Sequence, residues 1–357
     1  MKKRLLFTAY NLDLGGIETA LVNLLNRINY DKYEVTLVLE KKEGILLDKL
    51  DKRVNVREVK VSNSKNIVVR KTLNFARKLI FKIFNYHKYD FSCCYATYSY
   101  SSSKLALIGS KNSSLYVHSD YRNIYNEDEF YKFFNSRNVD QYRKIIFVSN
   151  ESKDGFIEKY SSLSNKCLVF NNFIDVDEVI KNSNENISIN KSKNKLLVFV
   201  GRLDDNSKKV SRQINLVKNI DNLDLWIVGD GSDRSKYEQE VVDNKLEDRV
   251  IFLGAKKNPF PYMKQADYII LTSDYEGFPV TYLEAIALNK KIITTIGVSD
   301  SDIDISKYAF IIDKDKEMMI KEVKDIIKTN KKIDYIDIEE IQKKRIKKIE
   351  EVFDEVI

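Results

Sequence analysis

Short apolar runs alternate with longer amphipathic stretches along this whole chain, and this alternation limits the possible folds most strongly. Each short run has the length of a buried strand, and each longer stretch has the apolar spacing of a helix. Such alternation is typical of βαβ units, which build parallel sheets covered by helices. In the first half, strands are expected at Arg4–Tyr10, Tyr33–Leu39, Val54–Val59, Phe91–Tyr95, Leu115–Val117, Lys144–Ser149 and Lys166–Phe170. In the second half, they are expected at Lys195–Val200, Leu223–Val228, Arg249–Leu253, Tyr268–Leu271, Lys291–Thr295 and Ala309–Ile312.

The chain has 357 residues, which is long enough for two domains that each bury a core. A polar stretch rich in Asn, Ser and Lys, residues 181–194, is the expected linker. It predicts an N-terminal domain at 1–180 and a C-terminal domain at 195–330. Residues 331–357 are strongly charged with helical apolar spacing, and this helical segment could pack back on the N-terminal domain.

Composition excludes several classes of protein. With 43% hydrophobic residues the chain is not intrinsically disordered. Three cysteines, Cys93, Cys94 and Cys167, have no spacing that suggests a disulfide framework or a zinc site. His87 and His118 are too few for a histidine-rich metal centre. We therefore expect a cytoplasmic protein without a metal site. The basic and then apolar N-terminus is interpreted as a first strand rather than a signal peptide.

The net charge of +7 is unevenly distributed, because residues 1–180 carry the excess of basic side chains. The densest basic segment, Lys65–Lys88, has no acidic residue and interleaves Lys and Arg with large apolar side chains. Lys82 interrupts its most apolar stretch, so no membrane span is expected. On a helix, this composition is typical of a segment on an anionic membrane surface. The alternative is a solvated basic face over an ordinary core stripe. Nucleic acid is not expected as a partner, since no nucleic-acid-binding motif accompanies the charge.

Glycines mark the strand ends of the second half. They occur at Gly201, Gly229, Gly231, Gly254 and Gly277, at or just past an expected strand. Ligands of open α/β sheets bind at the carboxyl ends of strands, where glycine lets backbone N–H groups approach a phosphate. Tight β–α turns also use glycine, but they do not require the polar side chains that accompany it here.

Two carboxylates, Glu276 and Glu284, form the clearest constellation. They lie eight residues apart, about two helical turns, so both can share one face. Glu276 falls in the loop before an expected helix, and Glu284 lies among apolar residues within that helix. An ionised carboxylate in that setting needs a partner such as a ribose diol. A buried structural glutamate is the alternative.

Basic residues and glycines supply two further anion-binding candidates. Arg202 and Lys208 follow an expected strand and could converge on a diphosphate. Gly15 and Gly16 join the first strand to a helix, where backbone N–H groups can bind an anion. The glycine spacing there is not that of a dinucleotide-binding fingerprint, which disfavours a nicotinamide dehydrogenase or a sugar epimerase.

These motifs together resemble the family-four retaining glycosyltransferases, glycosyl transferases group 1, of the subset that builds bacterial surface polysaccharides. Over residues 196–297 the family's order and spacing appear in Val200-Gly-Arg-Leu203, Trp226-Ile-Val-Gly-Asp-Gly231, Val250-Ile-Phe-Leu-Gly254 and Glu276-Gly-Phe-Pro279 with Glu284. Looser matches in the first half are Gly15-Gly-Ile-Glu18, Tyr116-Val-His-Ser-Asp120 and Asn171-Asn-Phe-Ile-Asp175. The resemblance implies the GT-B fold, in which two Rossmann-like domains face a central cleft.

The resemblance also implies a role for each matching residue. Arg202 and Lys208 would hold the diphosphate of a nucleotide-sugar donor, expected to be a UDP-sugar, and Glu284 would bind the ribose. The catalytic set would be Glu276, His118, Arg202 and Lys208, with His118 beside the anomeric carbon. The donor would further contact Gly15, Gly16, Gly229, Gly254, Gly277, Phe278 and Pro279. The family usually has glycine after the diphosphate-binding lysine, where this chain has Lys209.

The activity that the resemblance implies is transfer of a sugar, with retention, to a hydroxyl of a growing glycan. A lipid-linked acceptor of the capsule, exopolysaccharide or teichoic acid type is expected. The two cations would stabilise the departing diphosphate, so no metal or other cofactor is expected. The enzyme would be cytoplasmic, or peripheral on the inner face of the membrane. The alternative is a non-catalytic relative that binds a nucleotide sugar and acts as a partner or regulatory subunit.

Overall fold

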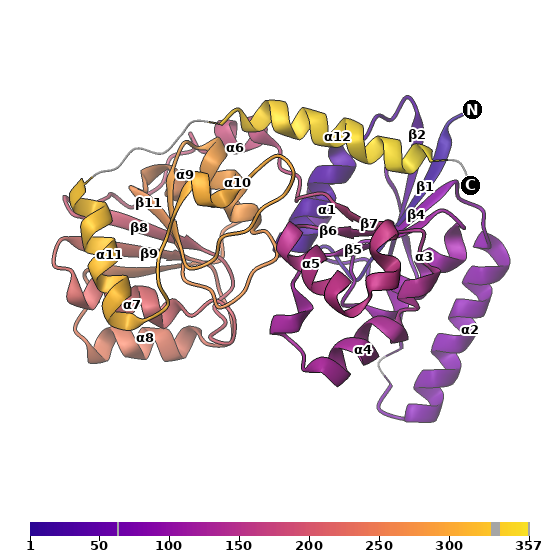
Figure 1. Cartoon of the computed structure of the whole chain (residues 1–357), viewed down its shortest axis with the longest axis horizontal. Coiled ribbons are helices and arrows are strands. Elements are labelled where there is room, and N and C mark those ends of the chain that lie inside the picture. The colour runs from indigo at the N-terminus through magenta and orange to yellow at the C-terminus, as the bar shows by residue number, and fades with distance from the viewer. Residues whose placement is uncertain (63, 330–335, 356–357) are drawn as a thin grey trace. The chain divides into compact units, whose positions relative to one another are not determined.

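The computed structural model describes residues 1–62, 64–329 and 336–355. The chain forms two compact units, and each is described by itself. Unit 1 comprises Met1–Phe173 and Gln342–Ile357, and unit 2 comprises Ile174–Ile341. Figure 1 shows that each unit has a sheet at its centre with helices around it.

Unit 1 is built on a parallel sheet. Among the described residues it has seven strands in the order β3-β2-β1-β4-β5-β6-β7. The strands are β1 Lys3–Ala9, β2 Tyr33–Leu39, β3 Asn55–Glu58, β4 Phe91–Cys94, β5 Ser113–Val117, β6 Lys144–Phe147 and β7 Cys167–Val169. Its strand order reverses between β1 and β4, and such a switch point is where open α/β sheets bind ligands.

The longer helices of unit 1 connect these strands. They are α1 Gly16–Arg27, α2 Ile67–Asn85, α3 Tyr100–Gly109, α4 Glu127–Ser136 and α5 Asn150–Lys159. Local sequence signals set several helix starts. Asn126 accepts from the backbone N–H of Glu129 at 3.0 Å, and Glu129 accepts from that of Asn126 at 3.2 Å, so α4 begins with a capping box.

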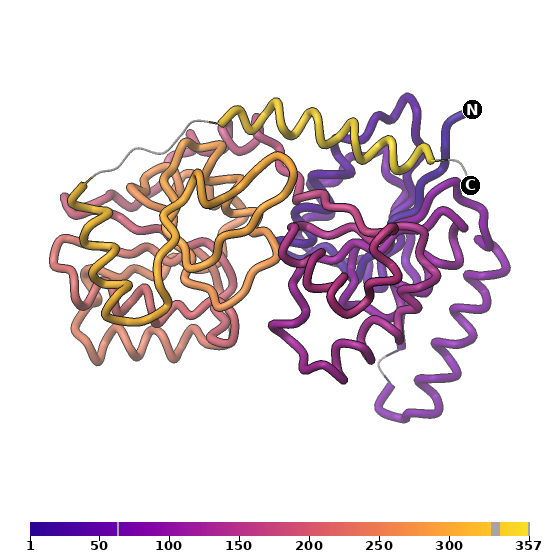
Figure 2. The backbone as a smooth tube through the Cα atoms, in the orientation of Figure 1, coloured from indigo at the N-terminus to yellow at the C-terminus, as the bar shows by residue number. Residues whose placement is uncertain are grey.

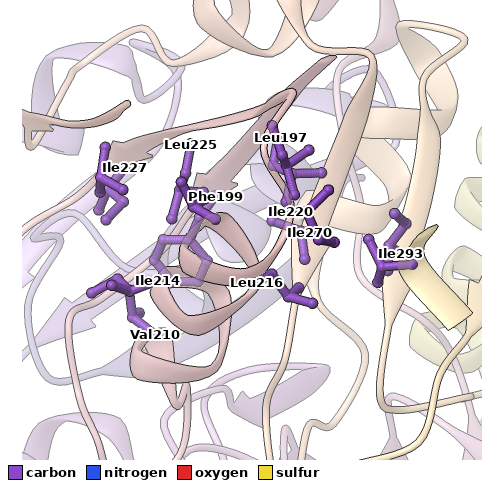
Figure 3. Packing of buried hydrophobic residues seen from close by; sticks show 14 of the residues in the cluster. Leu197, Phe199, Val210, Ile214, Leu216, Ile220, Leu225, Ile227, Ile270 and Ile293 are labelled. Carbon is purple, nitrogen blue, oxygen red and sulfur yellow. The ribbon is translucent and has the colours of Figure 1, made fainter. Parts of the chain in front are cut away.

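Unit 2 repeats the architecture with a six-stranded parallel sheet among the described residues, in the order β10-β9-β8-β11-β12-β13. The strands are β8 Lys195–Val200, β9 Leu223–Val228, β10 Val250–Gly254, β11 Tyr268–Leu271, β12 Lys291–Thr294 and β13 Ala309–Ile311. The helices are α6 Val176–Asn182, α7 Val210–Asn219, α8 Arg234–Asp243, α9 Phe260–Gln265, α10 Val280–Ala287 and α11 Lys316–Thr329. Strand and α7 side chains interdigitate in the core, as Figure 3 shows for Phe199, Ile214 and Leu225.

The final helix, α12 Ile338–Asp354, packs against the sheet of unit 1 near the N-terminus of the chain. Figure 2 shows the C-terminal end of this yellow helix beside strand β1. Phe353 is 2% exposed, and its ring contacts Phe7, Tyr33 and Phe91 at centroid distances of 5.9, 5.9 and 4.8 Å. Glu350 accepts from the backbone N–H of Asn29 at 2.9 Å. A core of unit 1 is therefore completed by residues from the far end of the sequence.

Each expected strand is present with its ends within two residues of the expected bounds, and the expected α/β class with two parallel sheets is confirmed. The boundary differs, because the units divide after Phe173 and the expected linker 181–194 lies inside unit 2. The reason is that α6 packs against α9 and α10, and the Asn258 side chain donates to the Asn182 carbonyl at 2.9 Å. Residues 330–335 and 356–357, at the end of the expected domain 195–330 and in the segment 331–357, lie outside the described residues. None of the described helices is long and apolar enough to cross a bilayer.

Candidate active site

Three strand ends in unit 2 form a surface made of backbone. Gly201 follows β8, Gly229 follows β9 and Gly254 ends β10. The Gly201 N–H donates to Val228 O at 3.1 Å, and the Gly229 N–H donates to Gly254 O at 3.0 Å. A Cβ on Gly229, whose φ is +155°, would lie 1.8 Å from Gly201 O. Glycine is therefore required at 229, and the carboxyl ends of these strands present main chain rather than side chains.

The main chain continues into the following turn. A Cβ on Gly231 would lie 2.3 Å from Leu203 O, and the Leu203 N–H donates to Asp230 O at 3.0 Å. The loops after β8 and β9 therefore run in contact. Gly229 and Gly254, which the resemblance assigns to contacts with the donor, lie at these strand ends.

An ion pair joins the two motifs of unit 2 that carry the predicted chemistry. Lys208 Nζ lies 2.5 Å from Glu276 Oε1, and the Ser273 hydroxyl donates to the same oxygen at 2.5 Å. The side chains of Lys208 and Glu276 are only 19% and 9% exposed. The Asp274 N–H donates to Ser207 O at 2.8 Å, which ties the two loops together through the backbone as well. The side chains of Lys208 and Glu276 are thus held in contact by an ion pair and by the hydrogen bond between their loops.

Lys209 supports the alignment of Lys208 with the family's lysine. Its φ of 50° lies in the left-handed region, where a non-glycine residue is strained. Lys209 precedes α7, and its carbonyl accepts from the Thr272 hydroxyl at 3.1 Å. The backbone here has the conformation that glycine adopts freely, at the position where the resembling family has glycine. Lys209 therefore differs from the family's glycine in residue type, while its backbone conformation is one that glycine adopts.

The remaining predicted residues of unit 2 are near Lys208 or Glu276 in the sequence. Arg202 is exposed, and within the described chain it makes no hydrogen bond or ion pair. Glu284 is 8% exposed and lies within α10, while Glu276 lies in the loop before that helix, as expected. Phe278 is 2% exposed, and Pro279 is the N-cap residue of α10. Gly277 is buried beside them.

In unit 1, Gly15 and Gly16 stand at the N-terminus of α1, the first helix after β1. Gly15 is the N-cap, with no side-chain cap. A Cβ on Gly16 would meet nothing within 4 Å, whereas one on Gly15 would lie 2.2 Å from Glu18 Oε2. The Tyr98 hydroxyl donates to Glu18 Oε1 at 2.8 Å and holds this carboxylate at the turn. Gly16 therefore leaves open space at a helix N-terminus, as an anion site needs.

His118 follows β5 of unit 1 and is 7% exposed. Its ring stacks on Tyr116 at 4.8 Å and packs on Tyr95 at 4.6 Å. Burial lowers the His118 pKa to about 3, although the Tyr95 backbone and the Asn172 side chain oppose that shift. Neither ring nitrogen has a protein partner of hydrogen-bond geometry among the described residues. His118 is therefore a buried imidazole that is neutral near pH 7.

Sequence reasoning did not find Ser273 or Asp274. Ser273 orients Glu276, and Asp274 binds Arg212 through Arg212 Nη1 and Asp274 Oδ1 at 2.6 Å. The signal that could have found them is their place directly after β11, because strand ends collect polar residues of a site.

The model of the glycosyl transferases group 1 family matches residues 194–329. We call these matched residues the group 1 domain. Arg202, Lys208, Glu276 and Glu284 all lie inside the group 1 domain, whereas Gly16 and His118 lie outside the match.

Curated relatives match mainly over part of their length. An uncharacterized glycosyltransferase of Methanocaldococcus jannaschii is 29% identical over 173 residues, which is 46% of this chain and 41% of that protein. A Campylobacter jejuni N-acetylgalactosamine-N,N'-diacetylbacillosaminyl-diphospho-undecaprenol 4-alpha-N-acetylgalactosaminyltransferase is 25% identical over 51% of this chain and 48% of its own. A lipopolysaccharide 1,6-galactosyltransferase of Escherichia coli is 27% identical, covering 40% of each chain. The chain thus spans less than half the length of these relatives.

Solved structures match over the whole chain and show the fold. HepE of Anabaena, solved with UDP and glucose, gives a TM-score of 0.77 at 16% identity and covers 99% of this chain and 100% of its own. TarM of S. aureus gives 0.72 at 12% identity, with 99% and 100% covered. The group 1 domain is therefore one of two Rossmann-like domains of a GT-B fold.

Proposed function

We propose that this protein is a retaining glycosyltransferase that moves a sugar from a nucleoside diphosphate sugar to a hydroxyl of a bacterial surface glycan. The observation that carries the proposal is the ion pair between Lys208 and Glu276. It brings the expected diphosphate-binding cation to the expected sugar-binding carboxylate, within a group 1 domain.

In this proposal the donor extends from the backbone surface to the ion pair. The base lies at Gly229 and Gly254, and the ribose hydroxyls bind Glu284. The diphosphate lies between exposed Arg202 and Lys208. Arg202 supports this role because its charge is not consumed by a protein carboxylate in the described structure. The sugar lies against Glu276 and the adjoining Gly277, Phe278 and Pro279, and Gly16 of the first unit offers backbone N–H groups to the distal phosphate.

The chemistry follows from where charge develops. As the bond from the anomeric carbon to the diphosphate breaks, negative charge grows on the leaving oxygen and positive charge on the sugar. Cations at Arg202 and Lys208 stabilise the first charge, and the Glu276 carboxylate stabilises the second. The acceptor hydroxyl attacks from the face that the diphosphate leaves, which gives retention, and its proton passes to the departing diphosphate oxygen. His118 offers an uncharged hydrogen bond beside the anomeric carbon, because burial keeps its imidazole neutral. We propose that the two cations act without a metal.

Relatives and structural neighbours support the choice of donor and acceptor. HepE was solved with UDP-glucose, which favours a UDP-sugar. The Campylobacter relative is named for a diphospho-undecaprenol acceptor, and the Escherichia coli relative for lipopolysaccharide. We therefore propose a lipid-linked acceptor on the inner face of the cell membrane, with Lys65–Lys88 as the segment nearest the lipid.

Thermal unfolding with a panel of UDP-, GDP-, ADP- and dTDP-sugars tests donor binding, with NAD(P) as the negative control. A donor at 100 times its Kd adds about 2.7 kcal/mol to the free energy of unfolding. We expect a shift with a UDP-sugar that is lost in Arg202→Ala. A shift with NAD(P) alone, or none with any nucleotide sugar, would contradict the proposal. Binding without turnover would identify the non-catalytic alternative.

A further inference from the structure

Helix α2 of unit 1 packs on the rest of the unit through a narrow side. Of its described residues, Phe81 and Asn85 are buried, each 7% exposed, and α2 contacts α3. Successive residues of a helix are about 100° apart, so Phe81 and Asn85 define one side of α2. Figure 1 shows α2 at the outer edge of unit 1, with little of the unit around it.

The opposite side of α2 is apolar and faces away from the unit. Phe75, Leu79 and Ile83 follow the i, i+4, i+8 spacing of one face and are 68, 47 and 68% exposed. Further large apolar residues widen this face: Val68, Val69, Leu73, Ile80 and Phe84, exposed by 70, 44, 41, 56 and 70%. A surface helix of a soluble protein normally turns its apolar face to the core. Contiguous apolar exposure of this kind marks an interaction site. We call these eight residues the outer face of α2.

Basic residues border the outer face on both sides. By helical spacing, Arg70 and Arg77 lie along one border, and Lys71, Lys78 and Lys82 lie along the other. The helix contains no acidic residue. Long basic side chains beside an apolar face reach anionic headgroups while the face enters the lipid. A second copy of the chain is a poor occupant, because pairing α2 with itself would bring these basic borders together.

A groove of about 300 Å³ adjoins the outer face, between α2 and the edge of the sheet. Its apolar wall includes Ile80 and Phe84 of the outer face, together with Val38, Val59 and Phe81. Arg57, Lys60 and Arg77 also line it, against one carboxylate, Glu58. Arg77 Nη1 donates to Lys60 O at 2.7 Å, and Glu58 Oε1 accepts from the Lys42 N–H at 3.1 Å. The groove thus combines a net positive charge with an apolar wall continuous with the outer face, which suits the phosphate and the first acyl carbons of a lipid.

We propose that α2 lies in the interface of an anionic bilayer with its outer face among the acyl chains, and that the groove binds the phosphate of one anionic lipid of that bilayer. The inference deepens the proposed function, on which it rests for the presence of a lipid-linked acceptor. Unit 1 would then be held at the surface where such an acceptor is found.

Vesicle flotation tests the outer face. The full chain is mixed with vesicles of phosphatidylcholine alone or with 30 mol% phosphatidylglycerol. We expect the wild type to float only with the vesicles that contain phosphatidylglycerol. We expect Phe75→Ser/Ile83→Ser to bind these vesicles at least 10-fold more weakly. The matched control is Val242→Ser, because Val242 is also an exposed apolar residue, 51% exposed, but lies in unit 2. Equal flotation of the wild type and Phe75→Ser/Ile83→Ser would overturn the proposal. It would also be overturned if the wild type were a dimer in solution and Phe75→Ser/Ile83→Ser were a monomer.

Titration with monomeric dihexanoyl phosphatidylglycerol, below its micelle concentration, tests the groove. We expect saturable binding to the wild type and to Phe75→Ser/Ile83→Ser, and at least 10-fold weaker binding to Arg57→Ser/Lys60→Ser. Inorganic phosphate should bind at least 10-fold more weakly than the lipid, because it lacks the acyl carbons. Equal binding of phosphate, or binding unchanged in the groove variant, would overturn the lipid site. The thermal shift with a nucleotide sugar should be the same in every variant, so failure here is distinguishable from failure of the proposed activity.

Discussion

At the scale of single residues, Lys208 and Glu276 are separated by 68 positions in sequence and yet form one ion pair. Their residue types and motifs could be predicted, because each motif lies within one loop. Their pairing could not, since it depends on β8 and β11 being neighbours in the sheet. Ser273 could not be predicted either, because its role depends on its contact with the Glu276 carboxylate.

His118 gives a prediction on pH dependence. Its pKa is lowered to about 3 in the folded chain, mainly by burial, against about 6.5 in the unfolded chain. Below about pH 6.5 the unfolded chain therefore binds a proton at His118 that the folded chain binds only near pH 3. The free energy of unfolding decreases as the pH is lowered across that window. Between pH 7 and pH 5 the wild type should lose about 2 kcal/mol more free energy of unfolding than His118→Asn.

Urea unfolding at the two pH values measures this difference. His87→Asn is the matched control, because His87 is half-buried and its pKa is lowered by burial and by Lys111 and Lys82. It should keep the wild-type loss between pH 7 and pH 5 far more closely than His118→Asn. If the wild type and His118→Asn lost the same free energy of unfolding between pH 7 and pH 5, His118 would be accessible to protons in the folded chain.

At the scale of helices and strands, alternating apolar runs predicted every strand of the described residues, because parallel strands are buried on both faces. The expected linker 181–194 was wrong because polar composition does not reveal that the preceding helix, α6, packs on α9 and α10. Lysine itself gives no signal for the left-handed backbone at Lys209, whereas the glycine that the resembling family usually has there is consistent with it.

Two glycine substitutions separate stability from binding. Gly16→Ala meets nothing within 4 Å, so the free energy of unfolding should be unchanged or rise by up to about 1 kcal/mol, since alanine favours helix. Gly229→Ala places a Cβ 1.8 Å from Gly201 O and should cost more than about 3 kcal/mol.

Thermal unfolding and donor titration measure both effects. Gly16→Ala should melt at or slightly above the wild-type temperature and bind the donor at least 10-fold more weakly, because the methyl group fills the space proposed for the distal phosphate. A stable Gly229→Ala would show that the strand ends can separate, and tight donor binding by Gly16→Ala would remove Gly16 from the site.

At the scale of the whole molecule, α12 joins residues from the far end of the chain to the sheet of unit 1. Truncating Phe353 to alanine removes a ring that is 2% exposed and contacts three aromatic residues. Its loss should cost about 3–5 kcal/mol of unfolding free energy. Lys347→Ala, an exposed position on the same helix, should cost less than about 0.5 kcal/mol. Equal unfolding curves for the two variants would show that α12 does not stabilise unit 1.

The central claim is that the Lys208–Glu276 pair is the reacting site of a glycosyltransferase. The most direct measurement is turnover of a UDP-sugar with a lipid-linked acceptor by wild type, Lys208→Met and Glu276→Gln. Lys209→Gly is the matched control, because glycine adopts the same left-handed backbone without strain. We predict that kcat falls at least 100-fold in the first two variants, a loss of about 2.7 kcal/mol of transition-state stabilisation, and is retained in Lys209→Gly. Turnover by Glu276→Gln at the wild-type rate would contradict the account.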